Sequence, residues 1–515
     1  MRYALRRPSR LLLFLLLATA SVSLARSRSF FVPRSITHNN VYELALRNYK
    51  TFWNQSDGSY GRAWLSLFAT PFYTQSVKEQ DLGRFFTPCN QNPFVADAKG
   101  GGNVNSIAFS IKNPNWSGDT EAQFRSLVNL RPRRTAYGVH FGLAADTNYF
   151  CRDTWFTVDF AAMGVKHQLD ICEFNVRNPG NKSGTGDTRS RFRNMKEALH
   201  NPDWCYGKFP ECGPRRKAGV DDIQLKLGYD WHPCAFDHFS MYLLATIPTG
   251  DRQMSEYVFE PVVGTRHGAL GMGINAASRF YECGDNSLTA MADIKFRYMF
   301  SATQRRSFDL KARGDWSRYL NVSPRGGNTV LFEPGINHFT LNCTVKPRAV
   351  LDAWLALHYQ WCNNWHIEAG YDFWYRVGEQ VKDPCGFDER YGFHRLPSDG
   401  SYDWPCLFDA DNTISCATIN RDCSHEDNGS TCLTSLSGSA ASDATLQVLS
   451  AEDLDLCYAG HPRAFTHTVY GVVAYDTAIC ERSVTFGLGG SYEAPQDKKY
   501  ALEQWAVWGT VTVAL

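Results

Sequence analysis

The sequence predicts an all-β protein, an antiparallel transmembrane β-barrel of about 14 strands (12–16) with long cysteine-containing outer loops. Three observations predict this fold. Several segments of 11–14 residues alternate between apolar and polar side chains, their apolar faces tend to end in aromatic residues, and the chain closes on one more such segment, 502–515. Strands in globular proteins are usually about 5–6 residues long, whereas a tilted membrane strand needs about 9–11. The length of the alternation therefore favours a membrane barrel over a soluble β-sandwich.

The charge balance and the hydropathy exclude two other classes of protein. The chain has 515 residues with 53 Lys+Arg against 52 Asp+Glu, so its net charge of +1 provides no basic face for nucleic acid. Beyond the first 25 residues no apolar run reaches the roughly 18 residues that a spanning helix needs, which excludes a polytopic helical membrane protein. The 14% of aromatic residues is too high for a disordered chain.

The first residues have the form of a secretory signal peptide. Four arginines lie among the first ten residues, an apolar core follows at 11–18, and Ser23-Leu24-Ala25 has the small-x-small pattern of a cleavage site. We therefore expect export to the bacterial outer membrane. The predicted division of the chain is a signal peptide at 1–25, an N-terminal periplasmic segment at 26–60 and a transmembrane barrel at 61–515.

Fourteen segments fit the two-residue period of a strand. An even strand number is typical of bacterial barrels, as are short periplasmic turns and longer outer loops. With both ends of the barrel chain in the periplasm, 77–134, 167–219, 249–267 and 377–464 become outer loops, and 317–335 becomes an unusually long periplasmic connection. The predicted strands are 61–76, 135–146, 154–166, 220–230, 236–248, 268–282, 287–300, 305–316, 336–346, 348–360, 363–376, 465–476, 481–492 and 502–515.

The polar faces of these segments carry charges of both signs. An Arg or Lys that faces lipid at the membrane midplane costs about 2–4 kcal/mol, so we expect the charges to face a polar lumen. Two interpretations stay open: a porin for passive diffusion of small solutes, with weak ion preference because the signs are mixed, or a barrel closed by ion pairs between its strands. The predicted pore-lining residues are Asp222, Lys226, Asp293, Lys295, Arg297, Asp309, Lys311, Arg313, Arg348, Asp352, Glu368, Asp372 and Arg376.

Two further functions stay open beside the porin. An outer-membrane barrel enzyme needs a base, for which His140, His358, His366 and His467 are candidates, but no serine stands at a telling spacing and we assign no catalytic residue. A secreted disulfide-rich binding protein is suggested by six Asn-x-Ser/Thr sites, although Asn342 lies within a predicted strand. No Walker A loop, EF-hand loop or C-x-x-C occurs, so we expect no cofactor and no metal.

The 16 cysteines fit an exported protein better than a cytosolic one. Six lie in the polar outer loop 377–464, where up to three internal disulfides with 15 possible pairings are expected. Five more fall in short connections that the topology assigns to the periplasm, and they predict a rim of thiols that cross-links to envelope partners or to neighbouring barrels. The loop set is Cys385, Cys406, Cys416, Cys423, Cys432 and Cys457; the periplasmic-turn set is Cys151, Cys234, Cys283, Cys362 and Cys480.

Parts of the chain resemble a known group of proteins. The motif FFVPRS at 30–35, the stretch 247–273 and the closing hairpin 481–515 are similar to outer-membrane barrel proteins of intracellular Gram-negative bacteria of the Dependentiae type. The likeness covers most of 30–76 and 220–376 and the last 50 residues, and it does not extend to the cysteine-rich segment 377–464. More distantly, the chain is similar to the cysteine-containing major porins of chlamydiae. The resemblance implies an outer-membrane location in contact with lipid and a porin-like activity toward small solutes. As partners we expect a homo-oligomer or disulfide-linked proteins of the envelope.

Overall fold

The fold is described from a computed structural model of the chain. The residues whose placement it describes are 27–47, 65–97, 124–147, 150–179, 192–211, 213–234, 237–324, 333–362, 364–394, 446–480 and 482–515. The predicted signal peptide at 1–25 lies outside these ranges. None of the helices within them is long and apolar enough to cross a membrane.

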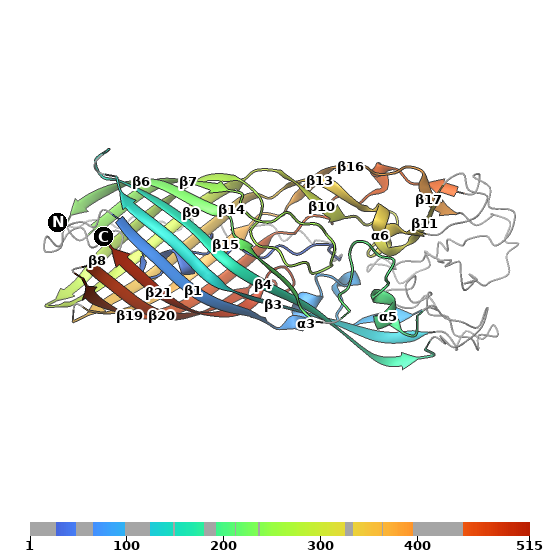
Figure 1. The fold of residues 1–515 in the computed structure, drawn as a ribbon, viewed down its shortest axis with the longest axis horizontal. Coiled ribbons are helices and arrows are strands. Elements are labelled where there is room, and N and C mark those ends of the chain that lie inside the picture. The colour runs from blue at the N-terminus through green and yellow to red at the C-terminus, as the bar shows by residue number, and fades with distance from the viewer. Residues whose placement is uncertain are drawn as a thin grey trace, which may run out of the picture.

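Twelve of the described strands form one closed antiparallel barrel (Figure 1). The ring closes because β3 pairs with β1 on one side and with β4 on the other. Two short strands, β2 (Phe94–Asp97) and β5 (Arg215–Val220), pair locally with β3 and β4. The barrel strands are β1 (Leu65–Val77), β3 (Arg125–Asp146), β4 (Thr154–Arg177), β6 (Ile223–Cys234), β7 (Asp237–Ile247), β8 (Ala269–Cys283), β9 (Asn286–Met299), β14 (Arg348–Trp361), β15 (Trp365–Arg376), β19 (Ala464–Ile479), β20 (Arg482–Pro495) and β21 (Glu503–Ala514).

The barrel has fewer strands than the sequence predicts. The expected strands 305–316 and 336–346 overlap β10 (Ala302–Ser307) and β13 (Thr340–Lys346), but these pair with each other, and β13 pairs with β16 (Gln380–Cys385), in a separate sheet. Alternation reports that one face of a strand is buried, and it does not report which sheet buries that face. Without these two strands, β9 connects to β14 through one long loop, and the expected periplasmic connection 317–335 becomes part of that loop.

The two ends of the barrel differ in their connections (Figure 1). At the short-turn end, brief turns join β3 to β4, β6 to β7, β8 to β9, β14 to β15 and β19 to β20, and the chain ends there at Leu515. At the opposite, long-loop end, the longest connections run from β1 to β3, from β9 to β14 and from β15 to β19. The predicted grouping of long loops on one side of the barrel therefore agrees with the fold.

The described parts of the long loops build a cap over the long-loop end. Besides the sheet of β10, β13 and β16, the cap holds a sheet of four very short strands and several single-turn helices. Its apolar core is rich in aromatic side chains, including Phe85, Phe86, Phe94 and Trp316. The remaining elements are α3 (Glu79–Gly83), η1 (Pro88–Asn90), α5 (Met195–Leu199), η3 (Ser317–Tyr319), β11 (Asn321–Pro324), β12 (Glu333–Pro334), α6 (Gly335–His338), β17 (Tyr391–His394), β18 (Leu446–Val448) and η5 (Ala451–Asp453).

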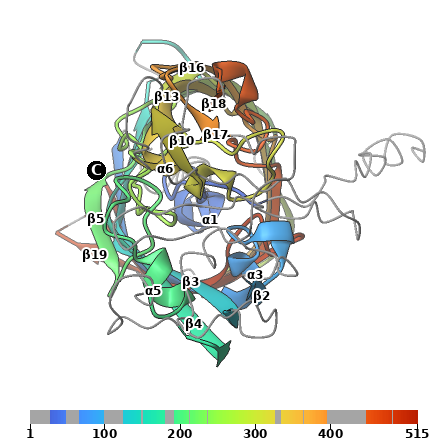
Figure 2. The same cartoon turned by 90° about the vertical axis from the view of Figure 1, so that its right-hand side faces the viewer.

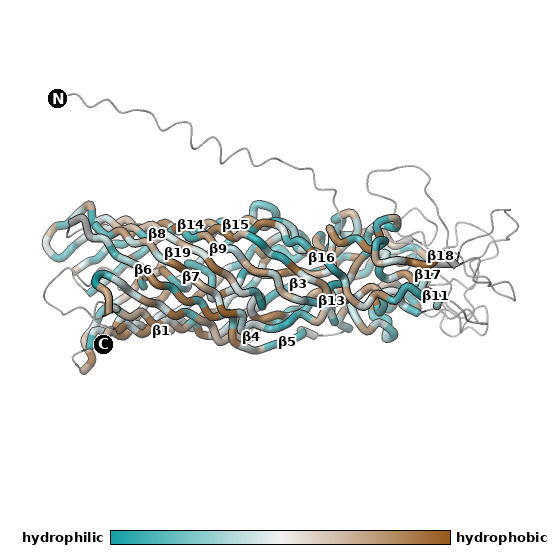
Figure 3. Tube along the Cα trace, turned by 90° about the horizontal axis from the view of Figure 1, so that it is seen from above, coloured by the Kyte–Doolittle hydropathy of each residue, from teal (hydrophilic) through white to brown (hydrophobic). Residues whose placement is uncertain are grey.

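The inner and outer faces of the wall have opposite chemistry. In β14, Leu355 and Leu357 are 54% and 52% exposed, whereas the intervening Ala356 and the adjacent Trp354 and His358 are buried. Figure 3 shows the same alternation of hydrophobic and hydrophilic residues along the barrel strands. The prediction that polar side chains turn inward and apolar side chains turn outward is confirmed, because successive side chains of a strand point to opposite faces.

Residues 27–47, called the plug from here on, run through the interior of the barrel (Figure 2). All of them except Pro33 are buried. The plug includes the short helix α1 (Asn40–Leu44), whose first turn is capped by the Asn39 side chain accepting from the Val41 N–H. An N-terminal periplasmic segment was expected at 26–60. That expectation is wrong for 27–47, because this segment lies against the inner face of the wall.

Candidate functional site

The plug passes along the lumen from the long-loop end toward the short-turn end. Ser27 contacts Asp315 in the cap, and the Arg28 N–H donates to the Phe85 carbonyl there. At the other end of the plug, Arg47 contacts Asp159 in the half of β4 that is nearer the short-turn end. Along this path the plug presents Arg34, Glu43 and Arg47 to the wall, and each of these side chains meets charges of opposite sign.

Arg34 occupies a site between two strands in the part of the lumen nearer the cap. Its guanidinium donates to Asp352 on β14 at 3.0 Å and to Asp372 on β15 at 2.6 Å, and all three side chains are buried. The Trp374 ring lies 5.6 Å from the Arg34 Cζ atom, close enough for a cation–π contact. Asp372 also accepts from the Asn40 amide at 2.7 Å. A planar cation is therefore held by two carboxylates and an aromatic ring.

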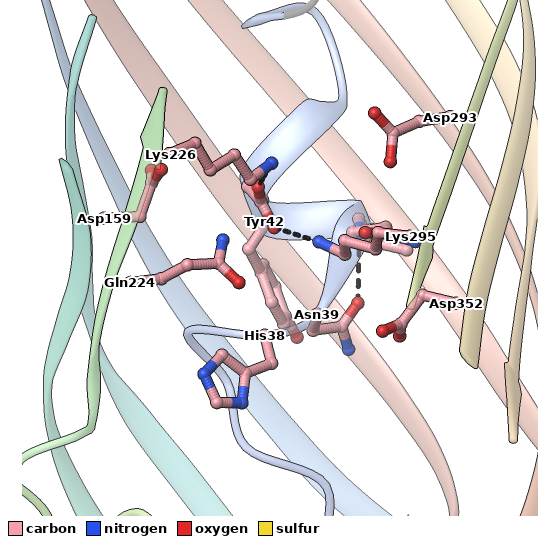
Figure 4. Close-up of polar contacts among 12 residues, drawn as sticks. His38, Asn39, Tyr42, Asp159, Gln224, Lys226, Asp293, Lys295 and Asp352 are labelled. Atoms are coloured by element: carbon pink, nitrogen blue, oxygen red, sulfur yellow. Dashed lines mark hydrogen bonds and ion pairs between the residues drawn. The ribbon is translucent and has the colours of Figure 1, made fainter. Parts of the chain in front are cut away.

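Glu43 occupies a second site with the opposite polarity. Its carboxylate bonds to the ammonium groups of Lys226 on β6 and Lys295 on β9, and all three side chains are buried. Figure 4 shows Lys226 and Lys295 pointing from the wall toward the plug helix α1. Asp293 lies beside this group and accepts a hydrogen bond from the Tyr242 hydroxyl at 2.8 Å. Because two buried cations converge on one carboxylate, removal of Glu43 would leave both without a partner in the plug.

Arg47 occupies a third site near the short-turn end. Its guanidinium donates to Asp159 at 2.6 Å, lies 3.2 Å from His140 Nδ1, and stands 4.3 Å from the centre of the Phe68 ring. Gly142 makes room for it, since a Cβ atom at that position would overlap the Arg47 guanidinium. The wall is thus shaped as well as charged to receive this part of the plug.

A chain of hydrogen bonds leads from the plug toward the short-turn end. The Leu46 N–H donates to Glu368, which also accepts from Tyr470 at 2.7 Å. Glu368 lies 3.1 Å from His358 Nδ1, His358 Nε2 lies 3.0 Å from His366 Nδ1, and His366 Nε2 lies 2.9 Å from Asp476. Two carboxylates and two imidazoles therefore form one network, which fixes these histidines in the wall.

The start of the plug is held in the cap. Asp315 accepts from the backbone N–H of Ser27 and of Cys89, both at 2.9 Å. Burial raises the pKa of Asp315 to about 6, with Asp309 nearby adding to the rise. Phe31 packs edge-on against Phe85 with ring centres 5.2 Å apart. The cap end of the plug is therefore held by apolar packing, by the Asp315 carboxyl and by the Arg28 guanidinium, which donates to the Cys457 and Gly460 carbonyls.

Little free space is left between the plug and the wall. One cavity of about 30 Å³ lies between the Arg34 segment and β9, β14 and β15, and another of about 40 Å³ lies beside Glu43 and Arg47. A cavity needs roughly 10–15 Å³ to hold a single water molecule. These spaces accommodate a few waters at most, so the described plug residues fill the part of the lumen that they run through.

Nine of the thirteen predicted pore-lining residues are buried on the barrel interior or beside it. Asp222 bonds to Gly250 and Thr265 of the loop between β7 and β8, and Arg376 donates weakly to the Val32 carbonyl of the plug. The other buried members are Lys226, Asp293, Lys295, Arg297, Asp352, Glu368 and Asp372.

The other four predicted pore-lining residues lie elsewhere. Asp309 pairs with Arg318 in the cap, exposed Lys311 donates to the Glu452 carbonyl, and Arg313 belongs to the same loop. Arg348 lies at the first position of β14 and donates to the Gly378 carbonyl at the long-loop end. The prediction failed for three of them because 305–316 is not a barrel strand, and for Arg348 because it lies at the end of one.

The histidines considered as bases all have polar partners. His140 contacts Arg47, His358 and His366 belong to the network above, and His467 bonds to Tyr371 through Nδ1. Within the described ranges, no group of three or more His, Cys, Asp or Glu side chains is arranged to hold a metal ion.

The cysteine predictions have mixed outcomes. Cys385 and Cys457 are unbonded, so the pairing of all six loop cysteines among themselves does not hold in this structure. Cys385 ends β16, where its backbone register with Asn342 of β13 fixes it. Cys406, Cys416, Cys423 and Cys432 lie outside the described residues.

The turn cysteines are gathered at one end of the barrel. Cys151, Cys362 and Cys480 are exposed and unbonded in turns of the short-turn end. Cys283, also exposed and unbonded, is the last residue of β8 at the same end, and Cys234 is the last residue of β6. Their assignment to the periplasm stays a prediction.

Sequence reasoning missed the plug residues Arg34, Glu43 and Arg47 and their wall partners Asp159 and Asp221. Asp221 accepts from the Ser35 hydroxyl at 2.8 Å. Residues 27–47 do not alternate, so nothing in their pattern placed them against a strand. The available signal was an inward face of β4 and β6 that carries carboxylates in need of counter-ions.

Comparison with known proteins gives no family for this chain. No family model and no curated protein matches it. Among solved structures it is similar to an outer-membrane channel from Pseudomonas putida F1, at 10% identity over 87% of this chain and 95% of that one with a TM-score of 0.32. It is also similar to a FadL homologue from Pseudomonas aeruginosa, at 8% identity over 94% and 99% of the chains with a TM-score of 0.30. At such identities the function of those proteins does not transfer to this chain.

Proposed function

We propose that the chain is an outer-membrane channel for small solutes that the plug holds closed. The observation that carries the proposal is a closed barrel with an apolar outer face and a charged lumen, in which the charges bind residues 27–47 rather than each other alone. A solid barrel needs no charged lumen and no separate segment inside it. A stretch of chain that is held in a lumen by non-covalent contacts can leave it.

The outer face supports a membrane location. Large apolar side chains stand exposed on strand after strand, among them Leu243 at 64%, Leu270 at 56% and Leu488 at 71%. Contiguous apolar surface of this kind is costly in water and stable in lipid. Closure of the sheet satisfies the backbone hydrogen bonds of every barrel strand, which a lipid environment requires.

The state described here differs from the freely open porin that the sequence allowed. Solute passage requires the plug to leave its wall sites at Asp352, Asp372 and Asp159, because the remaining cavities hold only a few waters. We assign no catalytic step to the protein.

The test is the conductance of the full-length protein in planar bilayers. The wild-type protein is expected to be mostly closed, and the double variant Arg34→Gln/Arg47→Gln to open often, because two of the three charged plug contacts are lost. Arg390→Gln is the matched control, since this exposed arginine pairs only with Asp388 in the loop. Equal, silent traces from all three proteins would refute the channel.

A variant that changes no charge tests whether the Arg47 side chain has to fit into its wall site for the channel to close. Gly142→Ala places a methyl group where the Arg47 guanidinium lies and changes no charge. We expect more openings than in the wild type, and no effect of an alanine at Gly490, whose Cβ would meet only a carbonyl at 3.5 Å. No increase for Gly142→Ala would count against the Arg47 site as a closing contact.

A further inference from the structure

The plug and the wall carry complementary net charge. The plug has three arginines, Arg28, Arg34 and Arg47, and one acid, Glu43, which gives it a net charge of +2. The wall strands have more buried acids than buried bases. Glu503 is left out here because Lys78 and Lys498 bind it. The remaining acids are Asp159, Asp230, Asp293, Asp352, Glu368, Asp372 and Glu493, and the bases are Arg134, Lys226, Lys295, Arg297 and Arg376.

The excess negative charge of the wall has specific positions. Among the contacts of the described residues, Asp372 bonds only to plug side chains, namely Arg34 and Asn40, so withdrawal of the plug leaves this carboxylate unpaired. Asp352 keeps its wall partner Arg297. Asp159 likewise loses its ion pair when Arg47 leaves.

Both arginine sites combine a carboxylate with an aromatic face. At the site nearer the cap, the Arg34 guanidinium bonds through two different nitrogens to carboxylates on two neighbouring strands, and the centre of the Trp374 ring lies 5.6 Å away. At the site near the short-turn end, Arg47 contacts Asp159 and the Phe68 ring. A guanidinium is planar, presents its donors in a fixed fork and stacks on rings, whereas an ammonium is a point charge with a strong hydration shell. These sites therefore fit a guanidinium better than an ammonium.

We propose that the emptied lumen selects cations and binds guanidinium-bearing solutes at Asp372, Asp352 and Trp374, with a second site at Asp159 and Phe68. In the closed state the plug arginines thus occupy the sites that the solute would bind. This inference rests on the proposed channel and names its substrate class. Lys226 and Lys295, which also lose Glu43 on opening, give such a solute's carboxylate a place between the two sites.

The experiment uses full-length Arg34→Gln/Arg47→Gln protein in planar bilayers, with reversal potentials measured in a KCl gradient. We expect cation preference. Methylguanidinium is then added and compared with methylammonium, a cation without the fork, and with methylurea, its neutral counterpart. Methylguanidinium should reduce the K⁺ current at a concentration about tenfold lower than methylammonium does, a difference of about 1.4 kcal/mol. Methylurea should have no effect.

A wall variant assigns the effect to its site. Asp372→Asn in the same background should raise the half-blocking methylguanidinium concentration about tenfold, and Glu389→Gln, an exposed loop acid, should leave it unchanged. Asp159→Asn gives a second reading if Asp372→Asn does not fold. Anion preference, equal block by both cations, or block that survives both wall variants would overturn this inference while leaving the channel standing. Silent bilayers would overturn the channel itself, and this inference with it.

Discussion

The two halves of the plug differ in how strongly ion pairs contribute to holding them. Near the cap, Phe31 is surrounded by the rings of Phe85, Phe259 and His461, within an apolar core built by the long loops. From Arg34 onward, the plug forms ion pairs with charged groups of the wall and also packs against apolar wall residues, with Tyr42 between the rings of Phe72 and Trp508. Apolar burial is non-directional and tolerates small movements, whereas a buried ion pair is lost when either partner moves. Loss of the ion pairs should therefore weaken the lumen half first, while the cap half stays attached as an anchor.

The difference also separates what closes the lumen from what keeps the segment attached. Breaking the ion pairs should free 34–47 while Phe31 keeps the chain at the cap. Breaking the aromatic contacts should loosen the cap while the ion pairs still fill the lumen. The following predictions test that separation.

The largest effect is expected from Glu43→Gln. The change leaves the ammonium groups of Lys226 and Lys295 buried beside each other without the carboxylate that joins them. Removing one partner of a buried pair typically costs about 3–5 kcal/mol, and here two cations share the loss. We expect frequent channel openings and a barrel that still shows heat-modifiable gel mobility. Closed traces with unchanged stability would show that the lumen half is not held by charge.

Phe31→Ala should act on the other half. Truncation of a fully packed aromatic ring costs about 3–5 kcal/mol, and this one loses three ring contacts. We expect faster proteolysis of the cap and a lower denaturant midpoint, with fewer added channel openings than Glu43→Gln produces. Opening as frequent as in the charge variant would erase the distinction between anchor and releasable half.

The anchor should also depend on pH through Asp315. Its pKa is about 6 in the folded protein because of burial and then of Asp309, and an unfolded carboxyl has a pKa of about 3.9. The folded state thus binds the proton more tightly, so this stabilisation is complete below pH 4 and is lost as the pH rises to about 6. The loss is at most about 3 kcal/mol. Between pH 4 and 7 the unfolding midpoint should fall less steeply for Asp315→Asn than for the wild type. Identical pH dependence in the two proteins would exclude the Asp315 carboxyl as its source.

The smallest change concerns thiol reactivity and leaves the fold intact. Burial raises the pKa of Cys343, in the cap sheet, to about 11, whereas Cys151, Cys283, Cys362 and Cys480 are exposed at the short-turn end. Maleimide at neutral pH should label the four turn cysteines quickly and Cys343 only after unfolding. On intact cells, labelling of the turn cysteines from outside would reverse the predicted topology. Monomers alone on non-reducing gels of envelopes would exclude the cross-linked rim.

Alternation predicted the wall well because it is a local property. Segment 348–360 corresponds to β14 (Arg348–Trp361), with Asp352 inward and Leu355 outward, as the pattern indicates. The same property misplaced β10 and β13, whose alternation is real but serves a sheet in the cap. Strand count depends on which strands pair over long distances, and a two-residue period carries no information on that pairing.

The plug could not be predicted, because its contacts are set by residues far away in the sequence. Arg34 meets Asp372 across 338 residues, and Arg47 meets Asp159 across 112. Lys226, Lys295 and Asp352 were correctly expected to face inward, but their partner was expected to be water or another strand. The charges were predictable, and their neutralisation by the N-terminal segment was not.

The central claim, that passage requires the plug to leave the wall, is tested most directly by tethering it. A Cβ atom at Gly487 would lie 2.7 Å from Leu46 Cδ1, so this wall position faces Leu46, and Leu46→Cys with Gly487→Cys is the pair to oxidise. Added to Arg34→Gln/Arg47→Gln, this pair should keep the channel closed when oxidised and let it open after reductant. The untethered double variant should conduct equally with and without reductant. A channel that conducts while the plug is tethered would contradict the account.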